Sequence, residues 1–85
     1  MFYYIYVLRS AIDRNLYVGF TNDLRHRVAE HNDGRVHSTA ARRPLELVYY
    51  EACRSQADAI KREKYLKSAC GKRYIKPRLR RYLTG

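Results

Sequence analysis

The stretch TNDLRHRVAEH, residues Thr21–His31, decides how this chain folds. Its polar ends and spaced apolar residues predict a short helix that follows a tyrosine-rich region. We expect Thr21 or Asn22 to cap the start, because a short polar side chain there accepts a hydrogen bond from an unpartnered backbone N–H. Gly34 lies just beyond the end, where glycine commonly stops a helix. This segment is therefore a self-contained helix.

One side of that helix is unusually polar. Its core-facing stripe, counted at i, i+3, i+4 and i+7, consists of Leu24, Arg27, Val28 and His31. An arginine or a histidine on an inward stripe must be paired, hydrogen-bonded or placed on a cleft, because burying an unpartnered polar group is costly. Arg27 and His31 are thus the first candidates for a functional site.

The residues before the helix predict a β-hairpin. Phe2–Arg9 is rich in Tyr, Ile and Val, Ser10–Asn15 carries turn-forming residues, and Leu16–Phe20 returns as a second strand. Side chains alternate between the faces of a strand. In the first strand, one face carries Tyr4, Tyr6 and Leu8, and the other carries Tyr3, Ile5 and Val7. In the second, Tyr17 and Gly19 lie opposite Leu16, Val18 and Phe20. Gly19 has no side chain, so another group can approach the sheet there.

The residues after the helix predict one more strand. Ser38 is expected to cap a single helical turn, residues 39–41, and Leu45–Cys53 reads as the third strand. Ser55 then caps a helix over Gln56–Ala69, which Gly71 is expected to stop. Pro77 is expected in the first turn of a last short helix, since proline in a helix interior removes a hydrogen bond.

A carboxylate interrupts the apolar stripe of the helix at Gln56–Ala69. That stripe consists of Ala59, Leu66 and Cys70, with Ile60 at its edge. Glu63 occupies its i+4 position. Glu63 is therefore a second sign of a site, and it lies on a different element from Arg27 and His31.

Together these elements predict an α+β fold. The order is strand, strand, helix, strand, helix, helix, which suits a small three-stranded, mainly antiparallel sheet flanked by helices. The 85 residues are enough for one domain, residues 1–85, with one modest core.

The charge balance narrows the choice of partner. The chain has 18 Lys and Arg against 8 Asp and Glu, a net charge of +10. A strongly basic protein of this kind most often binds a polyanion such as nucleic acid, and an anionic membrane surface is the alternative partner. The chain lacks an apolar run of about 18 residues, the length that a membrane-spanning helix needs. We therefore expect a cytoplasmic protein without a membrane partner, and we expect Cys53 and Cys70 to be core thiols.

The off-pattern residues suit hydrolysis of a phosphodiester. They are Tyr6, Tyr17, Arg27, His31 and Glu63. A lone carboxylate can hold Mg²⁺ or Mn²⁺ with its waters, and an arginine offers paired donors to a phosphate. A tyrosine or a histidine can accept a proton from the attacking water.

The same residues resemble the GIY-YIG nuclease superfamily over nearly the whole chain. Tyr4-Ile5-Tyr6 resembles the first signature and Tyr17-Val18-Gly19 the second. The helix with Arg27 and His31 resembles the family's next motif, and Ala59–Lys67 resembles its glutamate-bearing helix. Two features depart from the pattern: Tyr4 stands in place of a glycine, and residues 72–85 contain no asparagine.

The resemblance implies metal-dependent cleavage of DNA. Glu63 would bind Mg²⁺ or Mn²⁺, Arg27 would hold the scissile phosphate, and Tyr6 or Tyr17 would be the general base. His31 would orient or assist that tyrosine. We therefore predict a nuclease that acts on double-stranded or branched DNA, with a repair role, and RNA stays open as a substrate.

Two other functions use the same surface. The chain could be a non-catalytic nucleic-acid-binding module, or an adaptor that docks on a larger DNA-repair complex through a protein partner. Each candidate residue also has a purely structural explanation. Arg27 would form an ion pair with Asp23, and Glu63 would form one with Lys67. A strand tyrosine would be a packed ring without a catalytic role. Phosphate contacts that position the backbone are expected from the cations Arg27, Arg42, Arg43, Lys72, Arg73 and Lys76.

Overall fold

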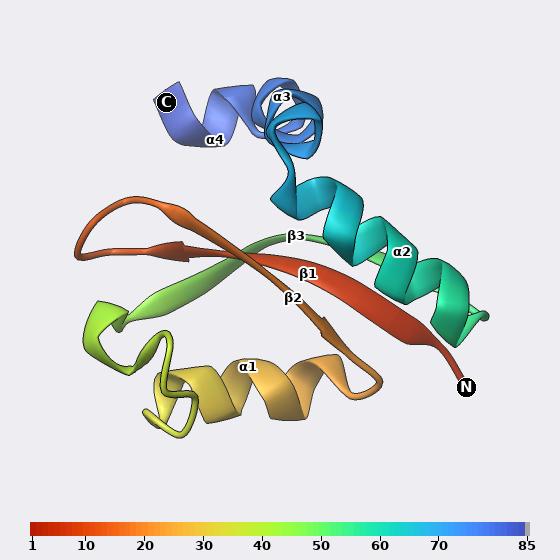
Figure 1. Ribbon diagram of the computed structural model, residues 1–85. Helices are drawn as coiled ribbons and strands as arrows, with labels where there is room; N and C mark the ends of the chain where they lie inside the picture. Colours follow the sequence, from red (N-terminus) through yellow and green to blue (C-terminus); the bar gives the residue numbers. More distant parts are fainter. Residues whose placement is uncertain (85) are drawn as a thin grey trace.

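The computed structural model describes residues 1–84 and confirms the α+β fold (Figure 1). Its sheet has three strands, β1 (Tyr3–Ser10), β2 (Leu16–Thr21) and β3 (Leu45–Cys53). The order is β2-β1-β3, and both pairings are antiparallel. β1 is therefore the central strand, while β2 is an edge strand whose outer side is open.

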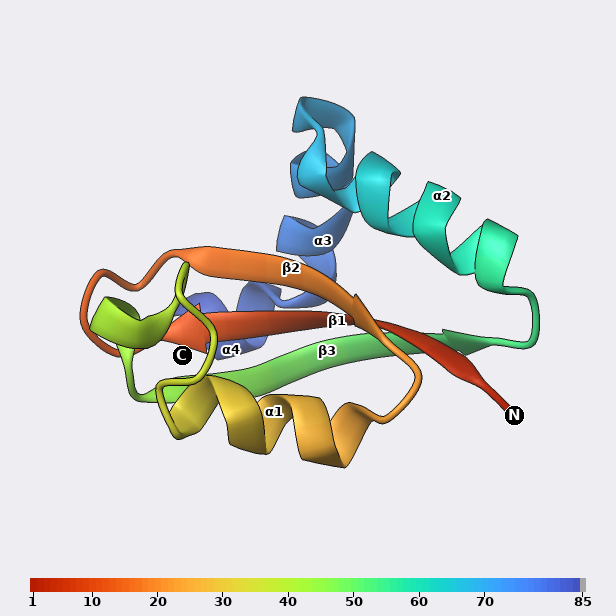
Figure 2. The ribbon, with the colours of Figure 1, turned by 60° about the horizontal axis from the view of Figure 1, so that its bottom comes forward.

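Helices cover both faces of the sheet. α1 lies on one face, and the helices that follow β3 lie on the other (Figures 1 and 2). The helical elements are α1 (Leu24–Asn32), the 3₁₀ turn η1 (Ala40–Arg42), α2 (Gln56–Lys67), α3 (Ala69–Arg78) and α4 (Arg80–Thr84). Over residues 1–84, no helix has the length and apolar character needed to cross a membrane.

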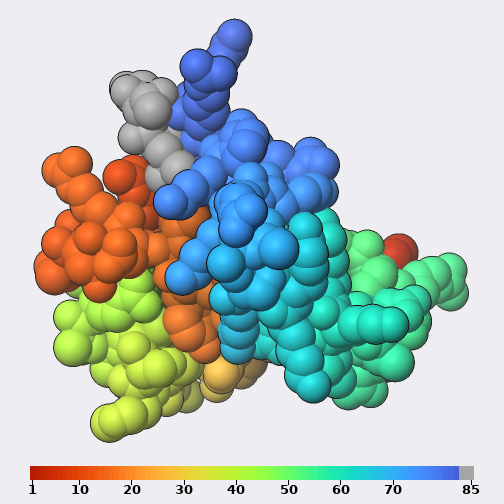
Figure 3. Space-filling model, turned by 45° about the horizontal axis from the view of Figure 1, so that its top comes forward, coloured from red at the N-terminus to blue at the C-terminus, as the bar shows by residue number. Residues whose placement is uncertain are grey.

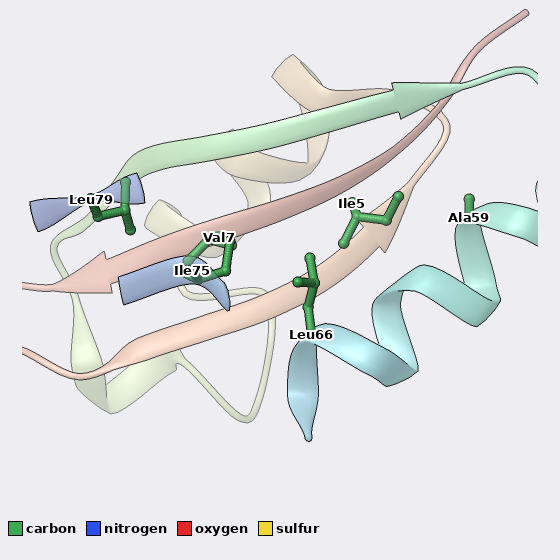
Figure 4. Packing of buried hydrophobic residues seen from close by; sticks show 6 residues of the cluster. All are labelled: Ile5, Val7, Ala59, Leu66, Ile75 and Leu79. Carbon is green, nitrogen blue, oxygen red and sulfur yellow. The ribbon is translucent and has the colours of Figure 1, made fainter. Parts of the chain in front are cut away.

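The predicted alternation of side chains is confirmed on both strands of the hairpin. Between the sheet and the later helices, a buried core consists of Ile5, Val7, Ala59, Leu66, Ile75 and Leu79 (Figure 4). On the α1 side, Tyr6, Leu8 and Leu45 form a second buried cluster, against which Tyr17, Leu24 and Val28 pack. The sheet thus separates an aliphatic core from a cluster that is partly aromatic.

The start of α1 differs from the prediction. Asp23 is the cap, and its side chain accepts a hydrogen bond from the backbone N–H of His26 at 3.2 Å. Thr21 instead accepts from the N–H of Asp23 at 3.0 Å, so the expected caps, Thr21 and Asn22, were placed too early. The predicted stop is confirmed, because Gly34 has a φ of 78°, in the left-handed region that favours glycine.

The helix predicted over residues 56–69 forms but ends early, and a second helix begins at Ala69. α2 ends at Lys67, and the side chain of Ser68 caps α3 by accepting from the N–H of Gly71 at 3.2 Å. Gly71 therefore lies in the first turn of a helix instead of stopping one. Cys70 moves with α3 and is exposed, so its assignment to the core was wrong.

The last helix also begins later than predicted. Pro77 lies in the final turn of α3, and α4 begins at Arg80. Pro77 lacks the N–H that would bond to the carbonyl of Arg73, and α3 ends one residue later, at Arg78. The prediction that Pro77 starts the last helix was wrong.

A polar cluster fastens α2 and α3 to β3. The guanidinium of Arg62 donates to both carboxylate oxygens of Glu51, at 2.8 and 3.0 Å, and the Tyr49 hydroxyl donates to the same carboxylate at 2.7 Å. Arg62 and Arg78 also lie over the ring of Tyr74, with guanidinium-to-centroid distances of 4.5 and 4.2 Å. This cluster holds the helix that carries Glu63 against the sheet.

We expect Glu51→Gln to lower the free energy of unfolding by about 1–2 kcal/mol at pH 7, between the values for exposed and buried ion pairs. The hydrogen bonds from Arg62 hold the pKa of Glu51 below its ordinary value. A lowered pKa contributes stability above the ordinary value, and that contribution disappears as the pH falls through the folded-state pKa. Urea unfolding of both proteins at pH 7 and in acid measures the difference.

The matched control is Asp33→Asn, which removes an exposed carboxylate at the end of α1. It should change the free energy of unfolding little at either pH. A Glu51→Gln deficit that is the same in acid as at pH 7 would contradict the assignment of this stability to the carboxylate charge.

Candidate active site

The site is built around the ring of Tyr6, which lies on Gly19. The two residues are paired in the β1–β2 register, and Tyr6 is only 1% exposed. A Cβ atom on Gly19 would lie 2.3 Å from both Cζ and Oη of Tyr6. The close approach predicted at Gly19 is therefore made by this tyrosine, and glycine is required for it.

A hydrogen-bonded chain runs from Tyr6 through His31. The Tyr6 hydroxyl lies 2.7 Å from Nε2 of His31, and Nδ1 of His31 lies 2.7 Å from Oγ1 of Thr39. The Thr39 hydroxyl in turn donates to the carbonyl of Val36 at 3.5 Å. Tyr6, His31 and Thr39 are all buried.

These hydrogen bonds fit one tautomer of His31, with the proton on Nδ1. Because the Thr39 hydroxyl donates to Val36, its oxygen accepts from Nδ1–H. A neutral imidazole has one N–H, so Nε2 is an acceptor and Tyr6 donates to it. Burial and the nearby charge of Arg27 lower the pKa of His31, which keeps the ring neutral at pH 7.

Thr39 was missed by the sequence analysis. It lies eight residues beyond His31 in a polar loop, where only its position just before η1 marks it. Neither periodicity nor charge indicates that its hydroxyl reaches a histidine. The contact depends on how the loop after α1 folds back over that helix.

Asn32 fastens the end of α1 to the sheet. Its side-chain amide donates to the carbonyl of Leu45 at 2.9 Å and accepts from the N–H of Leu45 at 2.8 Å. These two bonds mimic a strand pairing at the start of β3. They hold His31, the preceding residue, at a defined distance from the central strand.

Tyr17 lies beside the chain of hydrogen bonds. Its ring centroid is 6.4 Å from that of Tyr6 and 5.1 Å from that of His31. Both pairs have distances typical of favourable aromatic contacts. Unlike Tyr6, Tyr17 is only partly buried, so its ring forms part of the surface beside the open edge of β2.

Arg27 connects the buried chain to solvent. Burial raises the pKa of the Tyr6 hydroxyl to about 12, although the nearby guanidinium of Arg27 acts to lower that pKa. Arg27 also pairs with Glu30 at 3.3 Å, so the expected alternative pairing with Asp23 is replaced by one on the next turn. With its side chain 35% exposed, Arg27 can reach an external anion.

Glu63 lies on α2, on the other face of the sheet from α1 (Figure 1). Its negative charge raises the pKa of Tyr6, although burial has the larger effect. The carboxylate is 19% exposed and pairs with Lys67 at 3.0 Å, as its purely structural explanation predicted. The structure therefore brings Tyr6, Tyr17, Arg27 and His31 together on the α1 side of the sheet. Glu63 lies on α2, on the other side, where its partner is Lys67.

The donor set fits a hydrated divalent cation. Within residues 1–84, no group of three or more His, Cys, Asp and Glu side chains converges as a metal cage. Mg²⁺ usually retains several waters and takes only one or two carboxylates, with the substrate phosphate completing the shell. Glu63, which already lies opposite a cation at Lys67, suits that role.

The predicted phosphate-binding cations come from three segments: α1, the η1 region and α3. Lys72, Arg73 and Lys76 are exposed on α3. Arg42 is tied to Asp13 at 2.8 Å, and Arg43 donates to the carbonyl of Ala40 at 2.7 Å. Arg27 is the only one of the six that borders Tyr6.

Comparison with known proteins gives the family. A family model described as the GIY-YIG catalytic domain matches residues 2–82. A UPF0213 protein from Bacillus pumilus is 45% identical over 62 residues, which cover 72% of this chain and 62% of that protein. A UPF0213 protein from Pediococcus acidilactici is 40% identical over 77 residues, which cover 87% of this chain and 78% of that protein.

A solved structure shows the same fold. The solution NMR structure of the UPF0213 protein BH0048 from Bacillus halodurans matches with a TM-score of 0.55 and 31% identity. The match covers 88% of this chain and 82% of that one. Since the family match extends over nearly the whole chain, the protein belongs to the GIY-YIG family of nuclease domains, which generally use divalent metal ions, among its small UPF0213 members.

Proposed function

We propose that the protein is a divalent-metal-dependent endonuclease that hydrolyses phosphodiester bonds in DNA, on double-stranded or branched substrates met in cytoplasmic DNA repair. The observation that carries the proposal is the buried hydrogen bond of 2.7 Å from the Tyr6 hydroxyl to a neutral His31. A core tyrosine needs only some partner for its hydroxyl. A partner that can accept its proton, beside an arginine and a carboxylate, suits catalysis.

Tyr6 and His31 would act together as the general base. With its pKa raised to about 12, Tyr6 is almost entirely protonated at pH 7 and cannot serve alone as a phenolate. It can accept a proton from the attacking water only if it passes its own proton to Nε2 of His31. Thr39 acts as a positioning residue, because it keeps the other ring nitrogen protonated.

Arg27 would bind the scissile phosphate. Its guanidinium borders Tyr6 and remains partly exposed, so a phosphate that it holds lies beside the proton acceptor. Paired N–H donors match two oxygens of a phosphate and stabilise the charge that increases in the transition state. On binding, the phosphate would replace or share the present contact with Glu30.

Glu63 would hold Mg²⁺ or Mn²⁺. When bound, the ion supplies charge that polarises the phosphate and stabilises the leaving oxygen. Lys67 would have to release the carboxylate, since its Nζ lies 3.0 Å from Oε2 of Glu63. The protein itself would thus supply one carboxylate ligand to the ion, that of Glu63.

We expect Glu63→Gln to reduce Mg²⁺-dependent cleavage by about a thousandfold, because loss of the charge that stabilises a transition state costs several kcal/mol. The assay offers duplex, flap, fork, junction and single-stranded DNA, and one RNA, to purified protein with Mg²⁺, Mn²⁺ or EDTA. The matched control is Glu46→Gln, which alters an exposed carboxylate bonded to Tyr82 at the other end of the sheet. Cleavage that is equal in EDTA, or unchanged by Glu63→Gln, would contradict the mechanism.

A non-cutting nucleic-acid-binding module is the second candidate. The observation that favours it is the ion pair between Glu63 and Lys67, which engages the carboxylate that a metal ion would need. This function predicts DNA binding that weakens steeply with salt and no cleavage of any substrate in the same panel. An adaptor would instead bind free DNA weakly and a protein partner stably.

A further inference from the structure

A basic groove lies beside the candidate active site, between the β1–β2 turn and α3. Its volume is about 680 Å³, and it is lined by Arg14, Asn15, Leu16, Arg42, Lys72 and Lys76. The three chain segments that form it, the hairpin turn in orange, the η1 region in yellow-green and α3 in blue, meet on the face shown in Figure 3. Four of the six lining residues are cations.

The positive charge of the groove is only partly neutralised from within. Arg42 is paired with Asp13, at 2.8 Å from Nε, and also donates to the carbonyl of Asn15 at 3.2 Å. None of the six lining residues is acidic, and Arg14, Lys72 and Lys76 are exposed. An anionic ligand would therefore meet three solvated cations that are held close together.

The groove continues toward the catalytic residues. A second, smaller hollow of about 210 Å³ shares Leu16 and Lys72 with the basic groove and is also lined by Tyr17 and Lys67. Tyr17 contacts His31, and Lys67 pairs with Glu63. The two hollows adjoin at Leu16 and Lys72 and extend along β2, from Tyr17 and Lys67 to Arg14.

The conformation of Arg14 is a second, independent observation. Its φ is 60°, which is uncommon for a residue with a side chain and which glycine or asparagine adopts at lower cost. The turn is braced by Ser10, whose hydroxyl accepts from the N–H groups of Ile12 and Asp13 at 3.1 and 3.3 Å. An observed backbone outlier motivates a hypothesis of function, and here the residue that adopts it lines the groove.

We propose that this groove binds the sugar–phosphate backbone of a nucleic acid to one side of the scissile phosphate, with Arg14 and Lys76 as its outer contacts. The inference deepens the proposed function and rests on it for the position of the scissile phosphate. The contacts are charge-based and made to a repeating backbone, so they supply affinity and register without reading sequence. Occupation of the groove directs the strand past Tyr17 toward Arg27.

The test measures binding without cleavage. The variant combines Arg14→Asn, in which asparagine tolerates the left-handed backbone, with Lys76→Gln. Arg42 is left intact because it braces the turn through Asp13. Affinity for a labelled DNA duplex and for a single strand is measured in EDTA over a range of salt concentrations, for wild type, the double variant and a control pair, Arg25→Gln with Lys61→Gln. Both control residues are exposed, on α1 and α2.

The measured quantity is the slope of log K against log salt concentration. Each lost phosphate contact should reduce it by about 0.9 for duplex DNA and about 0.7 for a single strand. In the double variant, which loses two contacts, the slope should fall by about 1.8 for the duplex and by about 1.4 for the single strand. In the control pair the slope should change little. Equal slopes for the double variant and the control pair would overturn the groove assignment.

The result is distinguishable from failure of the proposed function. A reduced slope in the double variant, without cleavage of any substrate by wild type, would support the groove and reject the nuclease. Cleavage by wild type with an unchanged slope in the double variant would keep the nuclease and reject the groove.

Discussion

Replacing Tyr6 with phenylalanine is expected to lower kcat for DNA cleavage by about 10²–10⁴-fold, the range for loss of a general base. The substitution removes only the hydroxyl, so the ring still covers Gly19 and fills the buried cluster with Leu8 and Leu45. What is lost is the oxygen that donates to His31 at 2.7 Å. Initial rates at saturating substrate, with Mg²⁺, measure the effect.

A proton relay through Tyr6 and His31 makes a sharper prediction than a mechanism in which Tyr6 is the sole general base. If Tyr6 and His31 transfer one proton in sequence, Tyr6→Phe, His31→Ala and the double variant should reduce kcat by similar factors, because residues that act as a unit are strongly non-additive. Tyr17→Phe is the matched control, since it removes the hydroxyl of the neighbouring partly buried tyrosine. A larger loss in Tyr17→Phe than in Tyr6→Phe would transfer the role of base to Tyr17.

The pH dependence of cleavage tests the hydrogen-bonded pair of Tyr6 and His31 independently. Burial and Arg27 lower the pKa of His31, so its Nε2 remains available at pH 7 and becomes protonated only in more acid solution. Cleavage by wild type should therefore decline as the pH falls below the ordinary histidine pKa near 6.5. Tyr6→Phe should show little of this decline, while its folding is confirmed by circular dichroism.

Gly71→Ala is expected to lower the free energy of unfolding by about 3 kcal/mol, at the upper end of the usual range for overpacking. A Cβ atom on Gly71 would lie 2.1 Å from the carbonyl oxygen of Tyr65 and 2.3 Å from Cα of Leu66. Both are backbone atoms at the junction of α2 and α3, so no side-chain rotation relieves the clash. For a domain of this size the midpoint of thermal unfolding should fall by about 15 °C.

The sign of the change in unfolding free energy shows whether Gly71 is required by close packing or occupies an ordinary helix position. In an ordinary helix position, alanine is better than glycine by about 1 kcal/mol, so the substitution would raise stability. Cys70→Ala, in the same turn but exposed, is the matched control and should change the free energy of unfolding little. A Gly71→Ala protein as stable as wild type would show that the helices can separate without cost.

Local patterns were sufficient for much of this fold. The strict alternation in Phe2–Arg9 assigned Tyr6 and Ile5 to opposite faces, because side-chain direction in a strand depends only on position along the chain. The limits of the third strand, Leu45–Cys53, follow from Pro44 before it and Ser55 after it. The polar stripe on α1 identified Arg27 and His31 by the same logic, since helical period also needs no knowledge of the partner.

The errors occurred where the relevant partner is distant or sterically defined. Gly71 has the sequence context of a helix stop, but its role depends on how closely α3 approaches the end of α2. The separation of α2 from α3 at Ser68 likewise moved Cys70 from the core to the surface. Periodicity describes one helix and contains no signal for the angle at which the chain turns into the next.

The sequence by itself determined the strands, their two faces, the helix α1 and the identity of the polar residues that do not belong on apolar stripes, because these depend on neighbours within a few positions. Only the tertiary structure decided that Thr39 lies 2.7 Å from Nδ1 of His31, that Tyr6 lies over Gly19, and that Arg14 joins α3 in a basic groove. Each of these joins residues that are distant along the chain or depends on atomic distances, so hydrogen-bond geometry and close packing decide it.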